Sequence, residues 1–153
     1  MNMPTKQIAN DLFFASAEEF LREGRSVELR VKGFSMRPFL RNGRDVVVLA
    51  PVEEGVALRK GMVVLFRYRG RHVLHRVRRV DGGSLVIEGD GNYRTIEHAT
   101  TADVVAWVSE VRLDGGPRGF AYGSCRWRGR SAVSLTIKAL RTVAIDVKRK
   151  IIG

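Results

Sequence analysis

The sequence of 153 residues predicts one mostly β domain, a coiled antiparallel sheet or barrel with an N-terminal helix and a basic C-terminal helix. Two observations predict this fold class. Between residues 25 and 116 the chain consists of short strand-like apolar segments separated by glycine-rich turns, a spacing that favours an antiparallel sheet over alternating β-α units. Towards both ends of the chain, the apolar residues recur with the period of a helix instead.

The first predicted element is a helix over Thr5–Glu23, and Gly24 stands where a helix would stop. The apolar residues that recur at helical spacing are Ile8, Leu12, Phe13, Ala17, Phe20 and Leu21. The period then changes to two. Val27, Leu29 and Val31 alternate with charged residues, which predicts a half-buried strand.

Further strands are expected in the segments Val46–Leu49, Met62–Tyr68, His72–Val80, Leu85–Glu88 and Val104–Leu113. Turn residues, most of them glycine, separate these segments. The pattern predicts a single domain with three parts. These are a helix over residues 5–24, a β-rich body over residues 25–116 and a basic tail over residues 117–153.

Positive charge is concentrated in the tail. The chain has 27 Lys and Arg residues against 16 Asp and Glu residues, and residues 117–153 hold nine of the basic residues and one acidic residue. A helical stripe is formed by Val133, Ile137, Leu140, Ala144, Val147 and Ile151, with Lys138, Arg141, Lys148 and Arg149 off it. We expect a helix docked on the domain with its charges in water, or one lying on an anionic membrane surface. Contact with nucleic acid is the least favoured alternative.

The single cysteine, Cys125, excludes an internal disulfide framework, as expected in a reducing compartment. No apolar run approaches the ~18 residues that span a bilayer, and no secretory signal is visible. We therefore expect a cytoplasmic protein, with attachment to the inner face of the membrane as the alternative. The chain has no zinc-ligand spacing, phosphate loop or dinucleotide fingerprint, so we expect neither a metal nor an organic cofactor.

A candidate nucleophile is Ser35, which follows the first predicted strand and lies next to Gly33, a residue that permits a tight turn. Such a serine can present its hydroxyl and its own amide to a substrate. A serine hydroxyl is a poor nucleophile at neutral pH, so a base must lie within hydrogen-bond reach. The candidate bases are His72, His75 and His98.

Strand phase distinguishes His75 from His72. His75 shares a face with Val73 and Val77, and partial desolvation there favours the neutral imidazole that a base requires. Taken alone, this pattern favours a core histidine, just as Ser35 taken alone favours a turn or capping serine.

Several segments occur in the order in which a known family carries them. Gly33-Phe34-Ser35-Met36-Arg37-Pro38 resembles the Gly-x-Ser-Met-x-Pro box of signal peptidase I and the SOS-repressor autoproteases. Val73-Leu74-His75-Arg76-Val77 resembles the His-Arg-Val box of the archaeal and endoplasmic-reticulum signal peptidases, where the bacterial type has a lysine. Further resemblances lie in Gly43–Val48, Leu58–Phe66, Glu88–Asn92 and Val104–Val108.

The resemblance implies a signal-peptidase-like coiled sheet and a serine endopeptidase that cleaves a peptide or precursor protein without a cofactor. Ser35 Oγ would attack the peptide carbonyl, His75 would carry the proton, and the Ser35 amide would bind the oxyanion. Asp90 is expected to orient His75, with a structural turn role as its alternative, and Glu97 is the nearest substitute. Met36 and Pro38 are expected to shape the serine turn and line the substrate cleft.

The sequence also departs from the family. Met62 stands where the family usually has aspartate, and no membrane anchor is visible, which favours a dedicated processing peptidase over a housekeeping signal peptidase. Arg76 is expected to be a solvated strand arginine. Two alternatives stay open: an inactive family member that binds peptide in the same cleft, and a β-barrel that binds nucleic acid through the basic tail.

Overall fold

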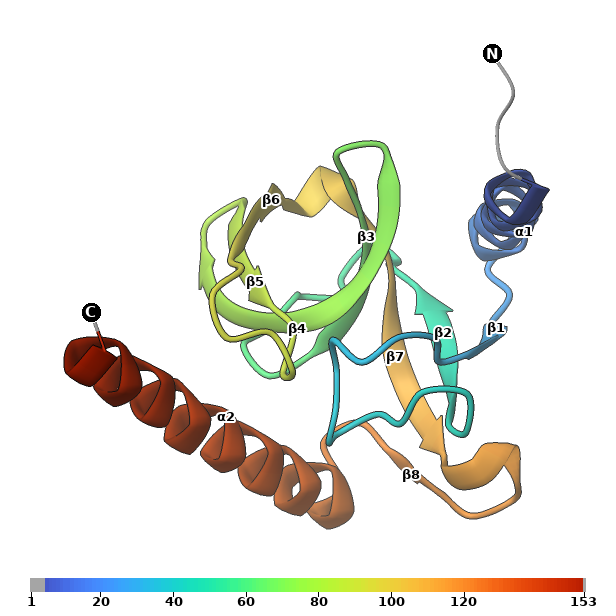
Figure 1. The fold of residues 1–153 in the computed structure, drawn as a ribbon. Helices are drawn as coiled ribbons and strands as arrows, with labels where there is room; N and C mark the ends of the chain where they lie inside the picture. The colour runs from blue at the N-terminus through green and yellow to red at the C-terminus, as the bar shows by residue number, and fades with distance from the viewer. Residues whose placement is uncertain (1–4, 153) are drawn as a thin grey trace.

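The computed structural model describes residues 5–152, in which one antiparallel sheet of eight strands coils without closing (Figure 1). The strands are β1 (Val27–Arg30), β2 (Val46–Pro51), β3 (Val63–Tyr68), β4 (Arg71–Asp81), β5 (Ser84–Glu88), β6 (Glu97–Thr100), β7 (Val104–Arg112) and β8 (Gly119–Ala121). Their order in the sheet is β1-β2-β7-β3-β4-β5-β6, and β8 pairs with β7. The predicted mostly β fold class is confirmed, as a coiled sheet rather than a closed barrel.

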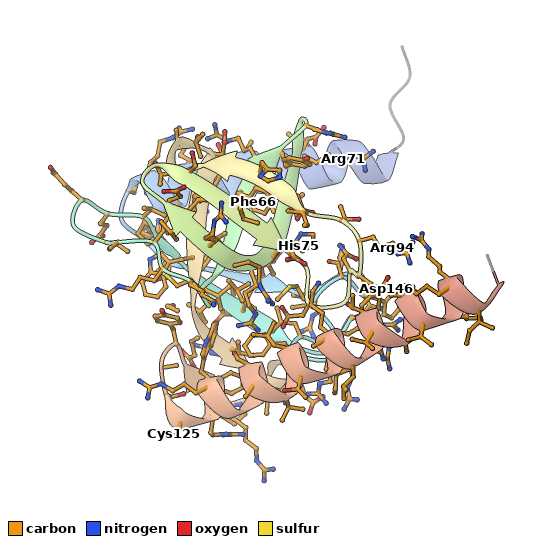
Figure 2. All side chains as sticks on the ribbon, turned by 90° about the vertical axis from the view of Figure 1, so that its left-hand side faces the viewer. Phe66, Arg71, His75, Arg94, Cys125 and Asp146 are labelled. Atoms are coloured by element: carbon orange, nitrogen blue, oxygen red, sulfur yellow. The ribbon has the colours of Figure 1, made fainter. Side chains whose placement is uncertain are left out.

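Two α-helices flank the sheet within the described residues. α1 (Thr5–Arg22) precedes β1 and α2 (Cys125–Ile152) follows β8, while the 3-10 turns η1 (Thr101–Asp103) and η2 (Leu113–Gly115) bound β7. Figure 2 shows α2 as a long rod along one side of the sheet, from Cys125 to beyond Asp146. Neither helix, over the part of the chain that the structure covers, combines the length and apolar character needed to cross a membrane.

Two strands of the sheet were not predicted from the sequence. β6 pairs with β5, and β8 pairs with β7 beyond residue 116, where the β-rich body was expected to end. Both are short, at four and three residues, and neither has the alternation of branched apolar and charged residues by which the equally short β1 was predicted. The segment 117–153 is therefore only partly a tail, because its first residues belong to the sheet.

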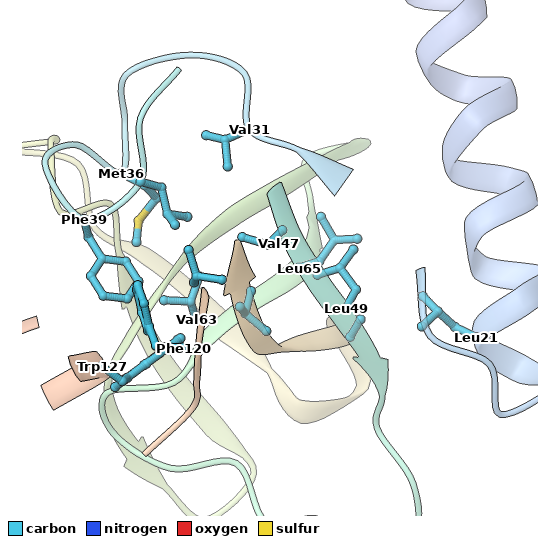
Figure 3. Close-up of a cluster of buried hydrophobic side chains, with 14 residues drawn as sticks. Leu21, Val31, Met36, Phe39, Val47, Leu49, Val63, Leu65, Phe120 and Trp127 are labelled. Atoms are coloured by element: carbon cyan, nitrogen blue, oxygen red, sulfur yellow. The ribbon is translucent and has the colours of Figure 1, made fainter. Parts of the chain in front are cut away.

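The larger apolar cluster joins the sheet, the segment after Ser35 and the start of α2 (Figure 3). Phe39 and Trp127 pack edge to face with ring centroids 4.9 Å apart, and Phe120 lies against both rings. Burial of such side chains stabilises the fold by about 2 kcal/mol each. Because Met36 belongs to the same cluster, the backbone that carries Ser35 is anchored in the core.

A second cluster fills the coiled half of the sheet between β3, β4 and β5. Its buried members are Met62, Val64, Phe66, Val77, Leu85 and Ile87. The ring of Phe66 lies 6.4 Å from the ring of His75, centroid to centroid. His75 therefore stands at the margin of an apolar cluster, which removes most of its contact with water.

Candidate active site

Ser35 lies in the loop between β1 and β2, and the backbone on both sides of it is held. Gly33 adopts a φ of +86°, a conformation that glycine takes without strain, and its N–H donates to Asn42 Oδ1 at 2.7 Å. The Leu40 N–H donates to the Met36 carbonyl at 2.9 Å. Ser35 itself is half-buried. A glycine and a buried methionine thus fix the turn that presents this serine.

The loop after β5 packs directly against the serine segment. The Gly91 N–H donates to the Ser35 carbonyl at 2.7 Å. A Cβ atom at Gly91 would lie 2.4 Å from the Phe34 carbonyl oxygen, and one at Gly89 would lie 2.4 Å from the Ser35 oxygen and 2.9 Å from His75 Nε2. Only glycine allows this approach at both positions. The backbone of Ser35 and the Nε2 edge of His75 are therefore neighbours across Gly89.

His75 lies on β4, where it is 6% exposed, and its Nδ1 is 3.0 Å from Glu97 Oε1 on β6. Burial, followed by the positive charge of Lys138, lowers the pKa of His75 to about 4, while the negative charge of Asp90 opposes the shift. The imidazole is consequently neutral at pH 7. Burial also raises the pKa of Glu97 above its usual range.

His75 lies close to Glu97, but the geometry of this contact does not meet that of a hydrogen bond. Among residues 5–152, neither His75 Nδ1 nor Glu97 Oε2 has a partner with hydrogen-bond geometry, and no hydrogen bond joins the Ser35 hydroxyl to the ring. Catalytic hydrogen bonds are commonly loose without substrate and tighten when the complex forms. The site places the Ser35 backbone beside the Nε2 edge of a neutral imidazole and a carboxylate beside its Nδ1 edge.

Ser35 and His75 line one cavity of about 760 Å³, within the range of ligand-binding pockets. Its walls come from β1, the serine segment, the first half of β4 and α1, which contributes Phe13 and Phe14. β1 is the terminal strand of the sheet, and β5 pairs with β4 only from Arg76 onward. Within residues 5–152, two strand edges without a strand partner, those of β1 and of residues 71–75 in β4, therefore border the cavity.

Asp90 does not contact His75, contrary to the expectation that it orients the base. Its carboxylate accepts two hydrogen bonds from Arg76, from Nε at 2.9 Å and Nη2 at 2.7 Å, and one from Ser134 Oγ at 2.7 Å. Asp90 is 1% exposed, so these contacts satisfy a buried charge. Its role is structural in this arrangement, and Glu97, the expected substitute, is the carboxylate beside His75.

The expectation that Arg76 is a solvated charge is wrong. Arg76 is 1% exposed and lies over the Phe39 ring at 4.4 Å. Besides Asp90, its Nη1 donates to the Gly61 carbonyl and to Ser131 Oγ, both at 3.0 Å. A buried guanidinium with this many acceptors ties β4 to the site loop and to α2.

Lys138 was expected to lie in water and instead enters the site from α2. It is 7% exposed, and its Nζ donates to the carbonyls of Gly89, at 2.7 Å, and Asn92, and lies 3.0 Å from Glu88 Oε2. The sequence signal that could have shown this is that Ser134 and Lys138 repeat at a spacing of four on one helix face. Through Lys138, α2 therefore fixes the loop of residues 88–92, and this loop in turn contacts the backbone of Ser35.

The other predicted residues are placed as follows. Met36 lines the cavity and is buried, whereas Pro38 is exposed and is not among the lining residues; the Arg37–Pro38 peptide bond is cis. His72 also lines the cavity, but its Nε2 is 2.8 Å from Glu18 Oε1. His98 is exposed and lies in a separate groove. His75 is the histidine that the fold brings beside the serine backbone.

Comparison with models of protein families and with curated protein sequences found no match to this chain.

Proposed function

We propose that this protein is a serine endopeptidase in which Ser35 is the nucleophile, His75 the general base and Glu97 the residue that orients the base. The observation that carries the proposal is the single cavity lined by Ser35 and His75, with a carboxylate 3.0 Å behind the imidazole. The resemblance of the Gly33–Pro38 and Val73–Val77 segments to the signal peptidase boxes points to the same pair of residues.

The chemistry begins with the neutral imidazole. If Nδ1 carries its proton towards Glu97, then Nε2, the atom that faces Gly89 and the Ser35 backbone, holds the free electron pair. Nε2 takes the Ser35 hydroxyl proton as Oγ bonds to the peptide carbonyl carbon. The imidazolium then gives the proton to the leaving amine, and a water molecule repeats the sequence to release the acid.

The oxyanion of the tetrahedral intermediate requires a donor beside Oγ. Within residues 5–152, the Ser35 N–H donates no hydrogen bond to another part of the chain. The Ser35 carbonyl accepts a hydrogen bond from the Gly91 N–H, which restrains the peptide group between residues 35 and 36. The peptide group that carries the Ser35 N–H is the one directly before it. A donor held in place before the reaction stabilises developing charge at little reorganisation cost.

The shape of the cavity favours an extended polypeptide as substrate. The edges of β1 and of residues 71–75 in β4 are unpaired where they border the cavity. A peptide laid between them can extend the sheet through backbone hydrogen bonds, which recognises a main chain regardless of its sequence. The apolar walls, including Phe13 and Phe14, then select side chains.

The test is cleavage of a peptide library, read by mass spectrometry, for wild type, Ser35→Ala and His75→Ala. We expect cleavage by wild type and a loss of about 10³-fold or more in each variant. Ser84→Ala and His98→Ala are matched controls, because both residues are exposed and lie outside the cavity. A fluorophosphonate probe should label Ser35 in wild type and not in Ser35→Ala.

Equal cleavage by wild type and Ser35→Ala would refute the proposal. Binding of peptides that remain intact in every variant would instead support the alternative of an inactive peptide-binding protein that uses the same cavity.

A further inference from the structure

The outer face of α2 is apolar and uncovered within the described residues. Its exposed apolar side chains are Val133 at 60%, Leu140 at 66%, Val143 at 60%, Val147 at 50% and Ile151 at 79%. At 100° per residue these positions fall within about a third of the helix circumference. They form a stripe, interrupted by Thr136, which we name the outer stripe and which runs from residue 133 to residue 151.

The opposite face of α2 packs on the domain. Trp127, Ser134 and Lys138 are buried and project to the side of the helix away from the outer stripe. Trp127 enters the larger core cluster, while Ser134 and Lys138 bind Asp90 and the loop of residues 88–92. The helix therefore cannot turn its apolar stripe inward without breaking these contacts, so the stripe is presented outward.

Basic residues border the outer stripe. Arg141 and Lys148 lie along one margin and Lys150 along the other, and all three are exposed. Over its whole length α2 carries eight Lys and Arg residues and one acidic residue, Asp146. A partner that covers this face must therefore offer both an apolar surface and negative charge.

We infer that the outer stripe of α2 docks on an anionic lipid membrane surface, with the helix lying in the plane of the headgroups. Apolar residues flanked by lysine and arginine gain both from burial at the acyl boundary and from the negative surface potential. A second copy of the chain would cover the stripe, but it would place the positive charges of Arg141, Lys148 and Lys150 next to the same positive charges on the other copy. A nucleic acid would meet the charge and leave the stripe in water.

The test is co-sedimentation of the full chain with sucrose-loaded vesicles. We expect binding to phosphatidylcholine vesicles with about 30% phosphatidylglycerol, and at least tenfold weaker binding to phosphatidylcholine alone. Leu140→Asn with Val147→Asn should weaken binding to the anionic vesicles at least tenfold through lost burial. Lys148→Gln with Lys150→Gln should weaken it about thirtyfold, and less at about 0.5 M salt.

Matched controls separate this face from general effects. Leu12→Asn removes an apolar side chain that is as exposed as Leu140, but on α1, and Arg59→Gln with Lys60→Gln removes two exposed charges from the body. Both controls should bind like wild type.

Three results would overturn the inference: equal binding to neutral and anionic vesicles, equal losses in the controls, or no vesicle binding at low salt. A dimer by light scattering that Leu140→Asn/Val147→Asn dissolves would assign the face to a second copy. Retention of a DNA duplex that this apolar pair leaves unchanged and Lys148→Gln/Lys150→Gln abolishes would assign it to nucleic acid.

Discussion

At the scale of single residues, the charge of Lys138 acts on the protonation of His75. The folded pKa of His75 is about 4, below its ordinary value of 6.5, because burial and the Lys138 ammonium both disfavour the imidazolium. We predict that Lys138→Met raises the His75 pKa and moves the acidic limb of the pH profile of kcat/KM to higher pH. The His75 ring signals in an NMR titration measure this shift directly.

Lys60→Met serves as the control for this titration, because Lys60 is exposed on the body. A His75 pKa that is the same in Lys138→Met and wild type would contradict the prediction. The lowered pKa of His75 also makes stability depend on pH. Between pH 6.5 and about 4 the unfolded chain binds a proton at His75 that the folded chain does not bind, so the free energy of unfolding falls as the pH falls through this range. Above pH 6.5 this loss is absent.

Glu97 is predicted to act on activity more than on stability. Glu97→Gln keeps the volume of the side chain but removes the carboxylate that, in the proposed mechanism, orients the imidazole and stabilises the imidazolium. We expect kcat to fall about 10²-fold or more. The urea midpoint should change little, since a neutral amide is accommodated where burial already raises the carboxyl pKa. Full activity in Glu97→Gln would exclude the orienting role.

Gly91 tests how far the position of Ser35 depends on the loop that supports it. Gly91→Ala introduces a Cβ 2.4 Å from the Phe34 carbonyl oxygen, so the backbone before Ser35 must move. A displacement of about 1 Å at a nucleophile can cost about 10²-fold in rate, and we expect a loss of kcat/KM of that size. Gly129→Ala is the control, because no atom lies within 4 Å of its added Cβ; similar activity in both variants would contradict the steric argument.

The sequence predicted Ser35 and His75 as candidates, and it offered Glu97, the carboxylate that lies beside His75, only as a substitute for Asp90. Glu97 reaches the site through strand register, because β6 pairs it with Ile87 on β5, and Ile87 pairs with Val77 on β4, two residues from His75. The β6 sequence Glu-His-Ala-Thr does not alternate between apolar and charged residues as β1 does, so this register could not be inferred. Asp90 was preferred because the Gly89-Asp90 pair matches the family's later box, and its ion pair with Arg76, which was expected to lie in water, was not foreseen.

At the scale of elements, the Arg76–Asp90 ion pair joins β4, the loop after β5 and α2. Both side chains are 1% exposed, so removing one leaves the other charge buried without a partner. We predict that Asp90→Ala lowers the free energy of unfolding by about 3–5 kcal/mol, measured by urea denaturation. Asp146→Ala, which loses a 3.9 Å pair between exposed Asp146 on α2 and exposed Arg94 in the loop after β5, should cost less than about 1 kcal/mol.

Equal stability losses in Asp90→Ala and Asp146→Ala would contradict the structural role given to the buried pair. A variant Asp90→Ala that keeps its stability but loses cleavage would return Asp90 to the catalytic set.

The helices show how far periodicity carries a prediction. α1 was predicted within one residue of its observed end, because its apolar spacing and Gly24 mark both its course and its stop. For α2 the stripe predicted a helix correctly but not its orientation. The face that packs on the domain is chosen by polar partners, Ser134 and Lys138, which hydropathy does not rank as core.

At the scale of the whole molecule, α2 divides into a half that packs on the domain and a half that is mostly exposed. The first half supplies Trp127 to the core and Lys138 to the site loop, whereas residues beyond Thr142 are mostly exposed. We predict that truncation after Thr142 changes the free energy of unfolding by no more than about 1 kcal/mol, since few buried contacts are lost. Truncation after Ser124 removes Trp127 and should cost at least about 3–5 kcal/mol.

Circular dichroism during urea unfolding measures both values, and peptide cleavage and vesicle binding are followed on the same samples. The chain truncated after Thr142 should retain cleavage, because Lys138 still binds the site loop. It should lose vesicle binding, because the outer stripe loses Val143, Val147 and Ile151. If the chain truncated after Thr142 remains folded but loses both peptide cleavage and vesicle binding, the part of α2 beyond Thr142 also supports the site. The two parts of α2, before and after Thr142, would then act together rather than separately.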